Sequence, residues 1–129
     1  MKVYVAGPMT NGGTASPEEI AANVRAGMAA AAALLAAGHA VYLPHLCVAL
    51  DAAHPQPYER WLTNDRAWIE ASDAIVRLPG ASTGADADVQ HAIQHRKMVC
   101  AGVDVFLEWA AEQAGTPART RNQTVSGQV

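Results

Sequence analysis

Hydrophobic and polar residues follow two alternating patterns along this chain. Short apolar runs, typical of buried strands, occupy residues 2–6, 39–43, 73–78 and 98–101. Between them, apolar residues return every three or four positions, which predicts helices over residues 16–38, 58–71, 85–96 and 104–114. Strands that alternate with helices in this way predict an α/β domain with a mainly parallel sheet.

Local signals mark the ends of the first predicted helix. Ser16 stands at the N-cap position, Pro17 at the first helical position and Glu19 where a capping box requires it. Gly38 suits a left-handed residue after the last turn. The first two strands and this helix therefore form a β-α-β unit, which favours a parallel pair with a right-handed crossover. The proline-containing interval 47–57 is predicted to be a loop.

Length and composition limit the class of protein. The chain has 129 residues, of which 50% are hydrophobic and 16% charged, so we expect one folded domain over residues 1–114. The polar segment 115–129, with its proline and glycine, is predicted to be a flexible tail. The net charge is −3 and no Lys/Arg block occurs, so a nucleic acid polymer is not an expected partner.

Targeting signals are not expected either. We find no apolar stretch that reaches the roughly 18 residues of a membrane span. The N-terminus enters a strand-like run directly, unlike a signal peptide. Cys47 and Cys100 are then expected to be reduced thiols in a cytoplasmic protein.

The residues best placed to bind a ligand follow the ends of the predicted strands. In open parallel sheets, ligands bind beyond the carboxyl ends of the strands. Here these ends are the Gly-rich segment 7–13, Pro44-His45, and segment 79–84 before a helix. Backbone N–H groups at a helix start, beside Ser and Thr hydroxyls, suit a phosphate. The alternative is that these glycines only turn the chain.

Two carboxylates are candidates for catalysis. Asp65 lies on the predicted helix 58–71, and Asp88 lies in the first turns of the helix that follows the third strand. Two carboxyl groups that face each other can cleave a glycosidic bond, one at the anomeric carbon and one at the leaving group. The alternatives are a solvated surface carboxylate for Asp65 and helix-dipole stabilisation for Asp88.

Three motifs, taken in order, resemble the nucleoside 2-deoxyribosyltransferase superfamily. They are segment 1–10, Asn64-Asp65 ahead of residues 72–74, and segment 82–85 followed by an acidic residue and Ala92. The resemblance is strongest to small deoxyribosyltransferase-like and deoxynucleoside 5′-monophosphate N-hydrolase-like members, and it covers most of the chain. It implies a flavodoxin-like, Rossmann-like parallel sheet of four to five strands flanked by helices.

The same resemblance implies an activity. Such enzymes cleave the N-glycosidic bond of deoxynucleosides or nucleoside monophosphates without a metal or organic cofactor, and they form homodimers or higher homo-oligomers. Asp65 matches the aspartate that assists departure of the base, Asp88 stands at the nucleophile position, and Ser82 matches a phosphate contact. His45 and Trp61 are further candidates, as a base or sugar contact and as a stacking surface. The expected substrate-binding residues are Gly7, Pro8, Met9, Thr10, Gly12, His45, Trp61, Ser82, Thr83 and Gly84.

One position departs from the family pattern. The family has glutamate where this chain has Asp88, which is one methylene shorter, and a misplacement of about 1 Å can cost roughly 100-fold in rate. This leaves three alternatives: a backbone that lies closer to the substrate, an Asp88 that acts through water, or a loss of the activity. The alternative function is therefore a non-catalytic nucleotide-binding or sensing module. A flavodoxin-like FMN protein fits less well, because the first loop lacks a Ser/Thr-rich phosphate cradle.

Other residues have simpler interpretations. His91 and His95 are spaced i, i+4 and could bind a metal, but no third ligand is obvious along the chain, so no metal is expected. Trp61 and Trp68, seven positions apart, favour core or dimer packing as the alternative to base stacking by Trp61. Tyr4 is expected in the core.

Overall fold

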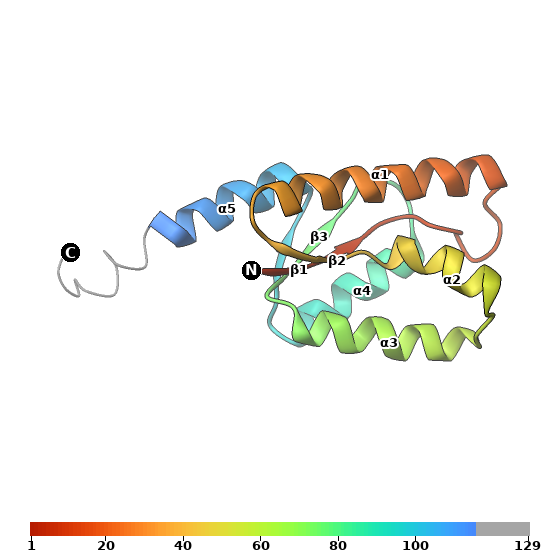
Figure 1. Cartoon of the computed structure of the whole chain (residues 1–129). Coiled ribbons are helices and arrows are strands. Elements are labelled where there is room, and N and C mark those ends of the chain that lie inside the picture. The colour runs from red at the N-terminus through yellow and green to blue at the C-terminus, as the bar shows by residue number, and fades with distance from the viewer. Residues whose placement is uncertain (116–129) are drawn as a thin grey trace.

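A computed structural model describes residues 1–115 and shows a parallel sheet between two layers of helices (Figure 1). The sheet has four strands in the order β2-β1-β3-β4, and every pair is parallel. The prediction of an α/β, flavodoxin-like arrangement is confirmed. The strands are β1 (Lys2–Ala6), β2 (Ala40–Tyr42), β3 (Ala74–Arg77) and β4 (Met98–Cys100).

Two helices cover each face of the sheet. Figure 1 shows α1 and α5 on one side and α3 and α4 on the other. A short 3₁₀ helix, η1, and helix α2 connect β2 to α3. The bounds are α1 (Pro17–Ala36), η1 (Pro44–Leu46), α2 (Cys47–Ala53), α3 (Tyr58–Ala71), α4 (Thr83–Gln94) and α5 (Val103–Gly115).

Successive side chains of a strand point to opposite faces of the sheet, so the core has two parts, one on each face. Val3 and Val5 of β1 point toward α1 and α5, where they pack with Leu34 and Phe106. Tyr4 lies on the opposite face with the residues of α3 and α4. Because each side chain of β1 after Lys2 is buried, β1 is the central strand around which both layers assemble.

The start of α1 is capped as predicted. The Ser16 hydroxyl accepts from the Glu19 N–H at 3.1 Å, and the Ser16 N–H donates to the Glu19 carboxylate at 2.7 Å. Gly38 follows the helix with φ +92°, the left-handed conformation expected there.

The length of α1 corrects one expectation. This 20-residue helix has a mean hydropathy of 1.2 and would by length and composition suit a membrane span, contrary to our expectation that no stretch does. A core helix of a folded domain passes the same test. α1 packs Gly27, Ala30, Ala31 and Leu34 into the domain, and alanine supplies most of its apolar character.

Two other boundaries differ from the predictions. Interval 47–57 is not all loop, because α2 occupies Cys47–Ala53. Its alanine and leucine residues favour a helix, and the prolines at which we predicted a loop come after it. α4 begins at Thr83 rather than Ala85, since Ser82 is the N-cap and caps one residue before a helix. Gly115 is the last residue of α5, and the rest of the predicted tail lies outside the described residues.

Candidate active site

The carboxyl ends of β1 and β3 meet at the switch in strand order. β2 pairs with one edge of β1, and β3 pairs with the other edge of β1. The Leu78 N–H donates to the Ala6 carbonyl at 2.8 Å, so the two strands stay paired to their ends. A ligand site is expected here, because the loops that leave the two strands diverge.

Two glycines allow these loops to lie against each other. A Cβ at Gly7 would be 3.0 Å from the Leu78 Cβ, and one at Gly80 would be 2.9 Å from the Pro8 Cγ. Gly80 also has φ +112°, a conformation that side chains disfavour. The loop after β1 and the loop after β3 therefore form one continuous wall.

The loop after β1 is held from behind by two side chains. The Asn23 amide of α1 donates to the Met9 carbonyl at 2.9 Å. His45 Nε2 lies 2.9 Å from the Pro8 carbonyl, which can only accept, so Nε2 carries the proton. Burial lowers the pKa of His45 and keeps it neutral, and Nδ1 has no hydrogen-bond partner among the described residues. We expected a base or sugar contact from His45, but its ring is 1% exposed and lies behind the loop.

In front of this loop is a cavity of about 170 Å³. It brings together residues that are distant in sequence, from the loop after β1, from α3 and from the start of α4. Asp65 and Asp88 both line it. So do seven of the ten residues expected to bind substrate, namely Gly7, Met9, Thr10, Gly12, Ser82, Thr83 and Gly84.

Burial makes both carboxyl groups weaker acids than an ordinary aspartate. Burial raises the pKa of Asp88 to about 6, although the Tyr4 hydroxyl, His91 and two arginines act in the opposite direction. Burial, and then the charge of Asp88, raises the pKa of Asp65 to about 7. Asp88 thus ionises first, and Asp65 loses its proton beside an existing negative charge. At neutral pH the pair combines a carboxylate with a carboxyl group that is partly protonated.

Tyr4 is a site residue that the sequence did not reveal. Its burial in the core is confirmed, with 0% exposure. Its hydroxyl donates to Asp88 Oδ2 at 3.2 Å, and its ring stacks on Tyr42 at 5.6 Å. One sequence signal could have pointed to it: Tyr4 lies inside an apolar strand, and a buried phenol hydroxyl needs a hydrogen-bond partner.

A second cavity, of about 200 Å³, adjoins the first and is mainly apolar. Its lining includes Trp61, Pro44 and Val48, and it shares Met9, Thr10, Tyr58 and Asp65 with the first cavity. Asp65 therefore stands where the two cavities meet.

The two tryptophans of α3 have separate places. Trp61 Nε1 donates to Asp51 of α2 at 2.7 Å, which fixes the indole in the wall of the apolar cavity. Trp68 stacks on Tyr42 at 5.0 Å and is 46% exposed. Trp61 is thus a cavity residue rather than a core residue.

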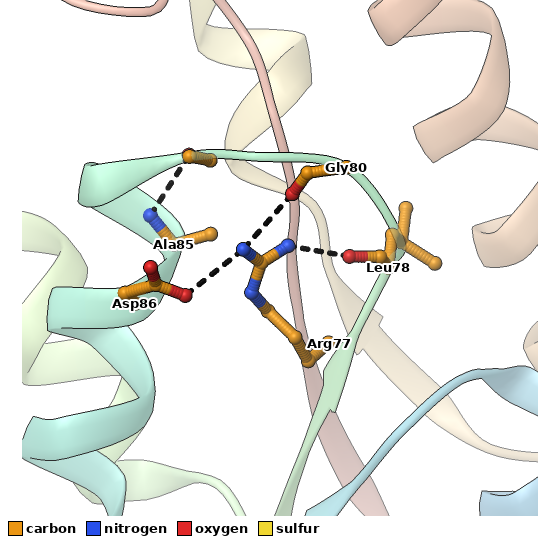
Figure 2. A network of polar contacts seen from close by, with 6 residues as sticks. Arg77, Leu78, Gly80, Ala85 and Asp86 are labelled. Carbon is orange, nitrogen blue, oxygen red and sulfur yellow. Dashed lines mark hydrogen bonds and ion pairs between the residues drawn. The ribbon is translucent and has the colours of Figure 1, made fainter.

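Arg77 holds the loop between β3 and α4, as Figure 2 shows. Its guanidinium donates to the carbonyls of Leu78 and Gly80 and pairs with Asp86 at 2.9 Å. At the end of this loop, the Ser82 hydroxyl accepts from the Ala85 N–H at 3.1 Å and begins α4. These contacts fix the helix start that lines the cavity, where first-turn N–H groups lack partners within the helix.

Comparison with known proteins gives a family. A family model described as Domain of unknown function (DUF4406) matches residues 1–101. The chain belongs to this family. The DUF4406 match spans all the strands of the sheet and includes both Asp65 and Asp88. No curated protein matches the chain.

Proposed function

We propose that this DUF4406 protein cleaves the N-glycosidic bond of a deoxynucleoside 5′-monophosphate or a related nucleoside. The observation that carries the proposal is a pair of partly buried carboxyl groups, Asp65 and Asp88, in one cavity at the switch point of the sheet. Titratable pairs in which burial moves the pKa values toward neutrality are typical of acid–base catalysis. The resemblance to deoxyribosyltransferases supports the same reaction.

The two adjoining cavities suggest how the substrate binds. The apolar cavity with Trp61 and Met9 suits a nucleobase, whose faces stack on an indole. The cavity with Asp88 suits the sugar. The start of α4, residues 82–84, suits a 5′-phosphate, because its N–H groups and dipole favour an anion. Asp65, at the junction of the cavities, is then beside the bond between base and sugar.

The proposed reaction uses these groups in turn. The bond between C1′ and the base nitrogen breaks, its electron pair goes to the base, and Asp65 supplies the proton. The Asp88 carboxylate bonds to C1′ or stabilises the oxocarbenium-like centre. Water then gives hydrolysis, with a proton returned to Asp65, and a second base gives transfer. Tyr4 keeps Asp88 ionised and oriented through its hydrogen bond.

Base release tests this proposal directly. The protein is incubated with deoxynucleoside 5′-monophosphates and deoxynucleosides, and free base is measured by chromatography. We expect base release from at least one of them, its loss in Asp88→Asn, and a strong decrease in Asp65→Asn. Asp104→Asn is the matched control, because Asp104 is an exposed carboxylate on α5.

The second candidate is a nucleotide-binding or sensing module without catalysis. It is favoured by one observation: Asp88 is shorter than the glutamate that the deoxyribosyltransferases resembling this chain have at this position. A nucleotide that raises the melting temperature while no base is released from any candidate would exclude the enzyme and support the module.

We also propose that the protein forms a homodimer. Met28 and Leu35 on the outer side of α1 are 50% and 58% exposed, and a second copy of the chain would cover them. Light scattering coupled to gel filtration should give twice the monomer mass of 13.5 kDa. A mass that stays monomeric at high concentration would contradict this.

A further inference from the structure

Three donor atoms converge at the other end of α3 and α4 from the cavity. Glu70 comes from the last turn of α3, and His91 and His95 come from the end of α4. Glu70 Oε2 lies 2.8 Å from His91 Nε2 and 3.7 Å from His95 Nε2, and the three donor atoms are all within 4.8 Å of one another. The rings of the two histidines are 4.3 Å apart.

These distances are close to those of a metal site. Zinc lies about 2.0–2.2 Å from histidine nitrogen and carboxylate oxygen, so tetrahedral ligand atoms are about 3.3 Å apart. The two distances from Glu70 bracket this value. The side chains of Glu70 and His95 are 48% and 41% exposed, so they can adjust without disturbing the core.

A backbone carbonyl sets which ring nitrogen of His95 carries a proton. His95 Nδ1 lies 3.0 Å from the His91 carbonyl oxygen. A carbonyl can only accept, so Nδ1 carries a proton, and Nε2 is the ring nitrogen that faces Glu70 and can offer a lone pair to a metal. Metal-binding histidines commonly donate their other N–H to a backbone carbonyl in this way, which sets the tautomer and the ring orientation.

The helix ends also favour a cation. Glu70 is in the last turn of α3, and His95 is the C-cap of α4, so both stand near unpaired carbonyls at negative dipole ends. Lys97 is the nearby positive charge that acts on Glu70 and opposes a cation.

We propose that Glu70, His91 and His95 form a binding site for a divalent transition metal, best suited to Zn²⁺, with water at the remaining position. Two imidazoles and one carboxylate form a donor set typical of zinc and its neighbours in the first transition row. On binding, the metal takes the place of the proton between His91 Nε2 and Glu70, and the neutral imidazole then carries its proton on Nδ1.

Such an ion would join the two helices that carry the candidate carboxylates. Asp65 is on α3 with Glu70, and Asp88 is one turn before His91 on α4. A metal held between the helix ends would therefore restrict the movement of Asp65 relative to Asp88. The metal site itself does not depend on the proposed activity.

Calorimetric titration of the untagged full chain with ZnCl₂ tests the site. We expect one equivalent to bind, with affinity weakened about tenfold or more in Glu70→Gln and in His95→Gln, as for loss of a metal ligand. Both residues are exposed, so both variants should fold, which far-UV circular dichroism in metal-free buffer checks. Co²⁺ in place of zinc should give the visible absorption bands of a tetrahedral site.

His39→Gln is the control, because His39 Nδ1 lies 3.1 Å from the N-terminal amine and makes the competing two-donor site. It should leave zinc affinity unchanged. The proposal is overturned if the chain binds no zinc, if both site variants bind it as well as the parent chain, or if His39→Gln abolishes binding instead.

Discussion

At the scale of residues, the site depends on how a few buried polar groups restrain one another. Asp88 is partly buried and accepts a hydrogen bond from Tyr4, whereas the negative charge of Asp88 acts on Asp65. The first arrangement favours an ionised group, and the second favours a protonated one. Two aspartates with the same intrinsic acidity therefore have different pKa values because of their surroundings.

Placing glutamate at position 88, as in the deoxyribosyltransferases that the chain resembles, tests the length of the proposed nucleophile. Asp88→Glu moves the carboxylate outward by roughly one C–C bond, toward the cavity that the substrate would occupy. We expect equal or higher base release, measured as kcat/KM for the best substrate. A decrease to background would show that the site is built around the shorter side chain and its 3.2 Å contact with Tyr4.

Removing the Tyr4 hydroxyl should change the acidity of Asp88. Tyr4→Phe deletes a hydrogen bond that stabilises the carboxylate, so the pKa of Asp88 should rise above about 6. The acid limb of the pH profile of kcat/KM should then move up by roughly one pH unit. Carbon-13 NMR of the Asp88 carboxyl gives the same pKa without turnover. An unchanged pKa would contradict this role for Tyr4.

At the scale of elements, the packing of α1 against η1 sets the position of the loop after β1. A Cβ at Gly27 of α1 would be 2.9 Å from the His45 Cγ, so the glycine leaves room for the imidazole. His45 in turn donates to Pro8, and Asn23 donates to Met9. The loop that lines the cavity is thus held by Asn23 and His45, neither of which lines the cavity itself.

A double-mutant cycle checks this support. Gly27→Ala should cost about 1–3 kcal/mol of unfolding free energy, because the methyl group displaces His45. In a His45→Ala background the same substitution should cost far less, or stabilise, since alanine favours a helix over glycine by about 1 kcal/mol. Urea unfolding measures both. Additive effects would show that Gly27 and His45 are not in contact.

At the scale of the whole molecule, burying two carboxyl groups in a small domain makes stability depend on pH. Asp65 titrates near 3.8 when unfolded and near 7 when folded. The folded chain therefore binds more protons between these values, and its stability falls as the pH rises through that window. His45, buried and neutral, acts in the opposite direction near its lowered pKa.

Comparing one variant with the parent chain isolates the contribution of Asp65. Asp65→Asn should be more stable than the parent at pH 8 by about 1–2 kcal/mol, a value reduced for the partial exposure of the side chain. The difference should shrink as the pH falls from 7 toward 3.8 and vanish at about pH 3 or below, because Asp65 is then protonated in both states. Thermal unfolding across this range measures it. A difference that does not vary with pH would mean that Asp65 is not buried as described.

The site could be predicted from sequence where local rules apply. The strand-end rule predicts Asp88, which follows the third strand, whereas Asp65 lies on the preceding helix and was matched by the deoxyribosyltransferase resemblance; both line one cavity. His45 was placed by the same rule, but its ring turned behind the loop, because Gly27 on α1 opens a space for it there. Rotation of a side chain into a space provided by a distant element has no local signal.

The sequence by itself determined the order of strands and helices along the chain, the caps of α1 and the strand-end loops where a ligand site was expected, because hydrophobic period, capping residues and strand ends are local properties. Only the tertiary structure decided which side chains meet. The contact of Tyr4 with Asp88, the junction at Asp65 and the approach of Glu70 to His91 and His95 join residues from different strands and helices. Their distances depend on how the helices pack on the sheet, which no local pattern encodes.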